Sequence, residues 1–206
     1  MKNFSNLYAF GCSYTYGDET TMYQIDPSRP SVNAWPSLLA NRLNLNCVNL
    51  GVSGASNDFI LKNVLTNFKN IKNNDLIVIM MTFPDRKLIN SVNEDKIVNA
   101  KPSENKYVDY YLKYHTEELG ILNFIQNLLS LQELLKNYSY YITFTTYEPV
   151  ILFKKYKWSK NVLIDKERTI VPPNLGFYSL IPDKKQHPND SGHKVISDTI
   201  YNFISK

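Results

Sequence analysis

The segment that decides the fold reads Leu7-Tyr8-Ala9-Phe10-Gly11-Cys12-Ser13, an apolar run that ends in a glycine and a hydroxyl side chain. The length and composition of residues 7–10 predict a buried strand, and the glycine after it predicts a turn. A hydroxyl group in this turn lies at the carboxyl edge of the strand, where ligands bind in open α/β sheets. Serine is also an ordinary turn residue, so a functional role for Ser13 requires partners from elsewhere in the chain.

Outward from this segment, predicted strands and helices alternate. Strands are expected at residues 47–50, 75–81 and 140–145. Helices are expected at residues 34–43, from Ser56 or Asn57 to 68, at 119–135 and at 191–204. Residues 19–33 and 90–105 are polar and predict loops, whereas residues 148–181 have no clear pattern. The alternation predicts an α/β three-layer sandwich, with a mostly parallel sheet of about five strands flanked by helices.

Composition limits the classes of protein that this chain can be. Its 206 residues, 43% hydrophobic and 20% charged, predict one globular domain over residues 1–206. The net charge of +4 is too small and dispersed to indicate a nucleic-acid partner. No apolar run approaches the roughly 20 residues that span a bilayer, and the amino terminus lacks the apolar core of a secretory signal. We therefore expect a cytoplasmic protein without a membrane partner, with export by another route or association with a virus particle left open.

Three blocks of the sequence, taken in order, form a recognisable set. They are Gly11-Cys12-Ser13, Asn49-Leu50-Gly51-Val52-Ser53-Gly54, and residues 187–193, which begin with His-Pro and end with Gly-His. In this order they resemble three motifs of the SGNH (GDSL-type) hydrolase family: the Gly-Asp-Ser-like turn that bears the nucleophile, an Asn-x-Gly-x-Ser-Gly-like loop and a His-Pro-x-x-x-Gly-His-like run. The resemblance covers nearly the whole chain and implies a flavodoxin-like fold and the hydrolysis of an ester.

The resemblance implies that Ser13 is the nucleophile and that a histidine is its general base. A serine hydroxyl is a poor nucleophile at neutral pH, so it needs an adjacent base such as histidine. Among the three histidines, His115 lies in a tyrosine-rich segment and His193 in the first turn of a helix, and both are expected to be structural. His187 precedes a proline in a loop expected at the same sheet edge, so it is the candidate base.

The resemblance also implies an oxyanion hole built from the N–H groups of Ser13 and Gly54 and from an asparagine side chain. The family's Gly-x-Asn-Asp block is Thr82-Phe83-Pro84-Asp85 here, with proline at the asparagine position. Asn57 is the first candidate for a replacement donor, although it could equally be a helix cap, and Thr82 and Arg86 follow it. Arg86 could instead bind an acidic group of the substrate or form a surface salt bridge.

The acid of the triad also departs from the family pattern. The family's aspartate lies three residues before its histidine, a position held here by Lys184. Asp183, one residue further back, is the candidate acid, and the alternative is a Ser–His dyad in which a backbone carbonyl orients the imidazole. Asp18 and Asp85 are assigned no chemistry.

The sequence therefore predicts a serine ester hydrolase that acts on a small-molecule ester, either a small-acyl ester or a carbohydrate O-acetyl ester. No cofactor is expected, and no metal, because no cluster of His, Cys, Asp and Glu has the spacing of metal ligands. Two alternatives stay open: an O-acyltransferase that uses the same serine, and a non-catalytic carbohydrate-binding module that retains the fold. The oligomeric state is not predicted.

Overall fold

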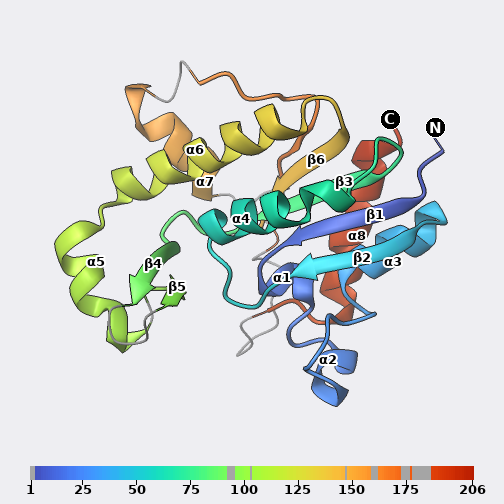
Figure 1. The fold of residues 1–206 in the computed structure, drawn as a ribbon, viewed down its shortest axis with the longest axis horizontal. Helices are drawn as coiled ribbons and strands as arrows, with labels where there is room; N and C mark the ends of the chain where they lie inside the picture. Colours follow the sequence, from blue (N-terminus) through green and yellow to red (C-terminus); the bar gives the residue numbers. More distant parts are fainter. Residues whose placement is uncertain are drawn as a thin grey trace.

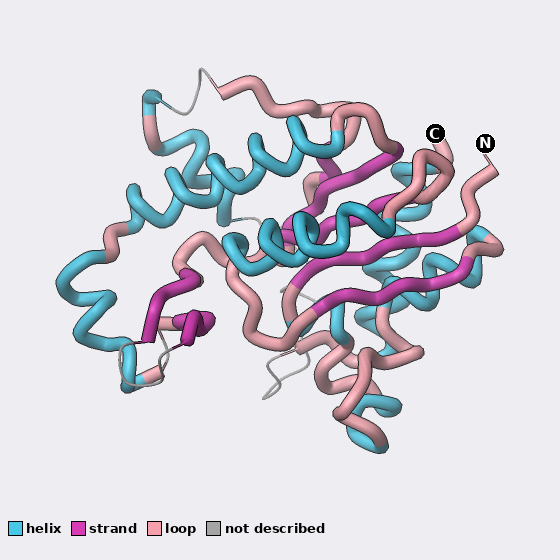
Figure 2. Tube along the Cα trace, viewed as in Figure 1, coloured by secondary structure: helices cyan, strands magenta, loops and turns pink. Residues whose placement is uncertain are grey.

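The structure, a computed structural model, describes residues 3–91, 96–102, 104–146, 148–158, 162–172, 177 and 187–206. Its centre is a sheet of five parallel strands in the order β2-β1-β3-β6-β7 (Figures 1 and 2). The strands are β1 (Asn6–Gly11), β2 (Asn46–Gly51), β3 (Leu76–Met81), β6 (Ser139–Phe144) and β7 (Thr169–Ile170). All six residues of β3 are buried, as a central strand covered on both faces requires.

Helices cover both faces of this sheet, which gives the predicted three-layer α/β sandwich. Helices α3 (Trp35–Leu43) and α8 (Asp190–Ile204) pack together on one face. Helices α4 (Asn57–Asn67) and α6 (Glu117–Leu135) pack together on the other face (Figure 1). In the described part of the chain, none of the helices has the length and apolar character needed to cross a bilayer.

The prediction of a loop over residues 90–105 is wrong. Strands β4 (Lys87–Ser91) and β5 (Lys96–Ala100) form an antiparallel hairpin in this region, separate from the central sheet. It is followed by the short 3-10 helix η2 (Asn105–Tyr107) and by helix α5 (Val108–Tyr114). Figure 1 shows the hairpin beyond the arrowheads of the central strands, at the carboxyl edge of the sheet.

Contacts from outside the hairpin explain why its strands form. The Asp58 carboxylate on α4 accepts a hydrogen bond from the N–H of Leu88 (3.1 Å) and lies 3.2 Å from Lys87 Nζ. The Tyr111 hydroxyl on α5 lies 2.8 Å from the carbonyl oxygen of Asp85 and 2.9 Å from that of Ala100. These contacts hold both ends of the hairpin at the carboxyl edge of the sheet.

Two other regions also contain more regular structure than the sequence indicates. Residues 19–33 include helix α2 (Thr21–Ile25), whose first turn is capped by the Thr20 hydroxyl, an acceptor for the Tyr23 N–H. Residues 148–181 include helix α7 (Glu148–Lys155) and strand β7. The two residues of β7 pair with β6, and a strand this short has no periodicity that a sequence could display. One further 3-10 turn, η1 (Phe68–Asn70), ends α4.

Candidate active site

Ser13 begins helix α1 (Ser13–Tyr16), which follows β1 so closely that only glycine fits beside it. A Cβ atom on Gly11 would lie 2.1 Å from Thr15 Oγ1, and one on Gly51 would lie 2.5 Å from the Tyr16 nitrogen. Because the two glycines lack that atom, the first turn of α1 rests directly on the ends of β1 and β2. The Ser13 side chain is thereby placed at the carboxyl edge of the sheet, as the sequence predicts.

His187 supplies the partner that this serine requires. Its Nε2 atom lies 2.9 Å from Ser13 Oγ, a hydrogen-bond distance, although the two residues are 174 positions apart. The imidazole ring packs edge-on against the Tyr14 ring, with 5.7 Å between the ring centroids. Two residues later, Asn189 caps α8 by accepting a hydrogen bond from the Gly192 N–H at 3.0 Å. The cap and the ring contact together fix the loop that carries the histidine.

The surroundings of His187 favour its neutral form. Burial lowers the pKa of His187, because an imidazolium loses hydration there. The carboxylates of Asp18 and Glu19 raise this pKa, and the cations of Arg86 and Lys101 lower it, with a net shift downward. A neutral imidazole whose Nε2 faces the hydroxyl can accept the serine proton.

The second ring nitrogen of His187, Nδ1, is the atom that an acid would hold in place. Asp183 lies outside the described residues. Within the ranges that the structure describes, His187 Nδ1 is buried and has no hydrogen-bond partner.

Asp18, to which the sequence analysis gives no chemistry, acts on His187 through its charge and accepts a hydrogen bond from Ser53 Oγ at 2.6 Å. Burial raises the pKa of Asp18, while the Ser53 hydrogen bond and the charges of His187 and Lys101 oppose this. Its position five residues after Ser13, in the same turn, is the sequence signal that could have identified it.

Backbone N–H groups suited to an oxyanion come from two loops. Ser13 is the first residue of α1, so its N–H has no acceptor within the helix. Gly54 has φ of +77°, a conformation that strains residues with a side chain. The loop that carries Gly54 is held to β1 by the Val52 N–H, which donates to the Gly11 carbonyl at 3.0 Å. Neither the Ser13 nor the Gly54 N–H donates to an acceptor in the described part of the chain.

Asn57 is neither the helix cap nor a free donor. Ser56 caps α4, since its hydroxyl accepts a hydrogen bond from the Phe59 N–H at 3.2 Å. The Asn57 side chain instead forms hydrogen bonds with the backbone that follows β3. Its Oδ1 accepts from the Thr82 N–H at 2.8 Å, and its Nδ2 donates to the carbonyls of Thr82 (3.2 Å) and Phe83 (3.3 Å). Both Nδ2 hydrogens are used, so Asn57 positions the third loop, and the expectation that it replaces the missing asparagine donor is corrected.

Thr82 and Arg86, the other candidates from the third loop, each carry a buried polar atom. Thr82 is fully buried at the end of β3, and its Oγ1 has no hydrogen-bond partner among the described residues. The Arg86 guanidinium lies over the Phe83 ring, with 4.9 Å between its central carbon and the ring centroid. Its Nη1 atom is buried without a hydrogen-bond partner in the described ranges, and no ion pair of Arg86 is seen there. The alternative of a surface salt bridge for Arg86 is therefore not supported.

Lys101, like Asp18, lies at the candidate site without having been predicted from the sequence. It directly follows β5, and a Cβ atom on Gly54 would lie 2.9 Å from its Cε and 3.0 Å from its Nζ. Its ammonium also lies 3.4 Å from the Glu104 carboxylate. Lys101 falls in a segment predicted as a loop, and only the hairpin brings it to the glycine loop, so no local pattern could reveal it.

The other two histidines have the structural roles expected of them. His193 is fully buried, and its Nδ1 accepts a hydrogen bond from the Trp35 N–H at 3.2 Å. Burial lowers the pKa of His193 to about 4. His115 packs against Tyr111, with 5.1 Å between the ring centroids. Within the described ranges, no group of three or more His, Cys, Asp or Glu side chains could hold a metal ion.

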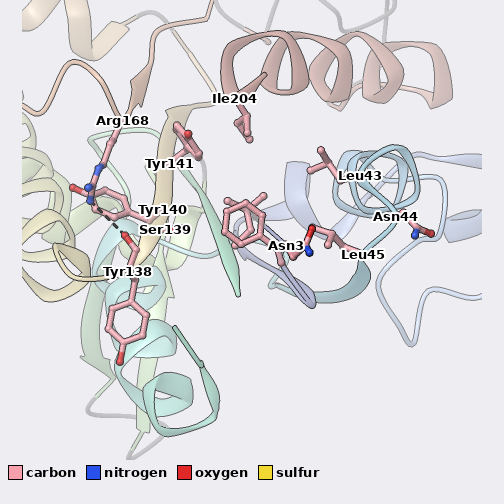
Figure 3. Close-up of a pocket in the computed structure, with 12 residues that line it drawn as sticks. Asn3, Leu43, Asn44, Leu45, Tyr138, Ser139, Tyr140, Tyr141, Arg168 and Ile204 are labelled. Atoms are coloured by element: carbon pink, nitrogen blue, oxygen red, sulfur yellow. Dashed lines mark hydrogen bonds between the residues drawn. The ribbon is translucent and has the colours of Figure 1, made fainter. Parts of the chain in front are cut away.

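A pocket of about 510 Å³ lies at the opposite, amino edge of the sheet and is separate from this site (Figure 3). Figure 3 shows Arg168 and Tyr140 on one side of it and Leu43 and Leu45 on the other. The described residues that line it include Ser139 but no histidine, cysteine or carboxylate. This pocket therefore offers no base to activate a nucleophile.

Comparison with known proteins supports the fold. No protein-family model matches the chain, and no curated protein matches it by sequence. Among solved structures, a member of the G-D-S-L family of lipolytic proteins from Veillonella parvula matches with a TM-score of 0.55 and 14% identity, over 98% of this chain and 99% of that chain. A psychrotrophic esterase from a Pseudoalteromonas species matches with a TM-score of 0.52 and 12% identity, over 98% and 97%. A catalytic mutant of an acetylxylan esterase from Geobacillus stearothermophilus matches with a TM-score of 0.51 and 15% identity, over 100% and 97%. The fold that the resemblance implies is thus confirmed.

Proposed function

We propose that this protein is a serine ester hydrolase that forms an acyl-enzyme on Ser13, with His187 as general base. The observation that carries the proposal is the 2.9 Å distance from Ser13 Oγ to His187 Nε2 at the carboxyl edge of the sheet. The lowered pKa of His187 supports it, because a neutral imidazole is the form that accepts a proton. The shared fold adds weight, since the structures it matches include esterases.

The reaction follows from the positions of these two side chains. Ser13 Oγ attacks the ester carbonyl carbon while His187 Nε2 takes the hydroxyl proton. The bond to the alcohol then breaks, and the imidazolium gives this proton to the leaving oxygen. Water attacks the acyl-enzyme next, and His187 takes a proton from the water and returns it to Ser13 Oγ as the acid leaves.

The N–H groups of Ser13 and Gly54 would stabilise the oxyanion of each tetrahedral intermediate. Thr82 Oγ1 and Arg86 remain the candidates for a third donor from the loop after β3. In the tautomer that accepts the serine proton, His187 Nδ1 carries a hydrogen, and a buried N–H needs an acceptor. We propose Asp183 for this role, with Asp18 contributing through its charge.

A small-acyl ester or a carbohydrate O-acetyl ester is the substrate class we propose. The acetylxylan esterase among the structural matches supports this choice. The Ser13–His187 geometry applies equally to the hydrolysis of other small esters.

A fluorophosphonate probe tests the proposal directly, because it labels only an activated serine. Wild-type protein should be labelled, and Ser13→Ala and His187→Ala should not, while their circular dichroism spectra stay the same. Cys12→Ala, a change at the neighbouring position, serves as the matched control and should still be labelled. Failure of folded wild-type protein to react, or equal labelling of Ser13→Ala, would show that Ser13 is not an activated nucleophile.

A further inference from the structure

We propose that Arg86 and Lys101 form an anion-binding subsite beside Ser13, and that it takes an acidic group, in its simplest form a carboxylate, carried by the ester substrate. This inference rests on the proposed function and specifies its substrate class. The two cations come from different parts of the chain: Arg86 from the loop after β3, and Lys101 from the end of the β4–β5 hairpin.

Lys101 is held where a substrate bound at Ser13 would meet it. Its Nζ lies 3.0 Å from the position that a Gly54 side chain would occupy, and Gly54 supplies one of the proposed oxyanion N–H groups. The next residue back, Ala100, is fully buried, and its carbonyl lies 2.9 Å from the Tyr111 hydroxyl. The lysine is therefore anchored at its backbone, while its side chain remains one third exposed and accessible to a ligand.

Arg86, the second cation, lies in the loop after β3. Its backbone N–H donates to the Phe83 carbonyl at 3.4 Å, and its guanidinium lies over the Phe83 ring. A buried guanidinium nitrogen without a partner costs stability, and folded proteins retain such groups mostly where they have a use. The charges of both Arg86 and Lys101 lower the pKa of His187, and Lys101 also lies beside Gly54.

Neighbouring carboxylates do not neutralise this pair. Glu104 lies 3.4 Å from Lys101 Nζ, but both side chains are one third exposed, and exposed ion pairs are weak enough for a ligand to compete with. Asp85 acts on Arg86 through its charge, but the two side chains form no ion pair in the described part of the chain. Asp18 acts on both His187 and Lys101 and is bound to Ser53. A substrate carboxylate would thus be a direct partner for the Arg86 guanidinium, whose planar fork suits carboxylate geometry.

Matched esters measure this preference. The neutral reference is 4-nitrophenyl acetate. Mono-4-nitrophenyl succinate carries a carboxylate on the acyl side, and the acetate ester of 4-hydroxybenzoate carries one on the alcohol side. Wild-type protein should have a higher kcat/KM for one of the two acidic esters than for the neutral ester, and the better one shows which side faces the cations.

Removal of the cations should reduce this preference. Arg86→Met and Lys101→Met should each lower the ratio of kcat/KM, acidic over neutral ester, by about 10- to 100-fold, the range of charge-assisted hydrogen bonds. Arg86→Lys and Lys101→Arg, which keep the charge, should retain part of the ratio. Arg29→Met and Lys113→Met remove exposed cations elsewhere and should leave it unchanged. In wild-type protein the ratio should also fall with added salt, because screening weakens the attraction.

Three results would overturn the subsite: no acidic ester preferred over the neutral one, equal loss on both ester types in the Met variants, or a ratio insensitive to salt. A merely structural role would instead lower the melting temperature of Arg86→Met with the ratio intact.

Binding to Ser13→Ala, measured by calorimetry with mono-4-nitrophenyl succinate and 4-nitrophenyl acetate, tests the subsite without turnover. Should wild type resist the fluorophosphonate while Ser13→Ala still binds the acidic ester more tightly, the hydrolase proposal fails and the anion subsite stands. Should the probe react while neither ester series shows a preference, the subsite alone fails.

Discussion

At the scale of single residues, the site is defined by how four charged groups, Asp18, Glu19, Arg86 and Lys101, act on one imidazole. Burial and two cations hold the pKa of His187 down, and two carboxylates partly compensate. The net downward shift of this pKa keeps His187 neutral at physiological pH. Without the two cations, the two carboxylates would raise the pKa with less opposition.

The pH profile of hydrolysis should reflect this balance. The acidic limb of kcat/KM for 4-nitrophenyl acetate should have its midpoint below the usual histidine value of 6.5, since only neutral His187 accepts the proton. Lys101→Met removes a charge that lowers this pKa, so the midpoint should move to higher pH. Asp18→Asn removes a charge that raises it, so the midpoint should move to lower pH. Lys113→Met should cause no movement, and equal midpoints in all four proteins would contradict this electrostatic description.

The residue scale also shows what sequence can and cannot reveal about the site. Ser13 and His187 each lie in a recognisable block of the sequence, and the structure brings the two side chains within 2.9 Å of each other. The role of Asn57 is not found, since its hydrogen bonds go to backbone atoms 25 and 26 positions away. Lys101 is missed for the same physical reason: its neighbour Gly54 is near only after folding.

At the scale of elements, the position of Ser13 depends on the close contact of α1 with the ends of β1 and β2. Asn49 Nδ2 donates to the Thr15 carbonyl at 2.7 Å, and Asn49 Oδ1 accepts from the Gly51 N–H at 3.0 Å. The strand end and the helix are thus joined by one side chain. Any added atom between them must displace backbone.

Gly51→Ala should therefore harm both stability and activity. Its methyl group would lie 2.5 Å from the Tyr16 nitrogen, too close for any real contact. Overpacking of this kind costs roughly 1–3 kcal/mol, measured as the change in free energy of unfolding in urea. Fluorophosphonate labelling should also slow, because α1 carries Ser13. Asn46→Ala, at the exposed opposite end of the same strand, is the control and should change stability little. A Gly51→Ala protein as stable and as reactive as wild type would refute the contact.

The elements with a strong pattern are predictable, and those held by distant contacts are not. The buried run of β3 and the apolar spacing of α6 and α8 mark them in the sequence, and the structure confirms all three. The β4–β5 hairpin has a polar sequence and forms because Asp58 and Tyr111 anchor it. Its existence could not be inferred from residues 90–105 alone.

At the scale of the whole molecule, the final helix links stability to pH through a histidine outside the site. His193 on α8 is buried against α3, where it accepts a hydrogen bond from the Trp35 N–H. Its pKa of about 4 lies below the 6.5 of an unfolded chain, so the unfolded state binds more protons between these values. The stabilisation is complete above pH 6.5 and is lost as the pH falls towards 4.

Unfolding experiments across this window should show the effect. Protonation of His193 should decrease the free energy of unfolding by roughly 3 kcal/mol between pH 6.5 and 4, because each unit of pKa difference contributes 1.36 kcal/mol. His193→Asn, which keeps an acceptor for Trp35, should be less stable at neutral pH but should lose less on acidification. His187→Asn is the comparison, because the pKa of His187 is also lowered and contributes with the same sign. An unchanged pH slope in His193→Asn would rule out His193 as the group responsible.

The β4–β5 hairpin has a consequence for how this molecule could diversify. The hairpin forms its own two-stranded sheet, apart from the five-stranded sheet at whose edge Ser13 lies. Replacement or redesign of the hairpin would change the charged side chain that lies beside Gly54, which is now Lys101. The order of the central strands and the turn that bears Ser13 would stay the same. Under the proposed function, substrate choice and bond cleavage are encoded in separable parts of the gene, and selection could change the first while leaving the second untouched.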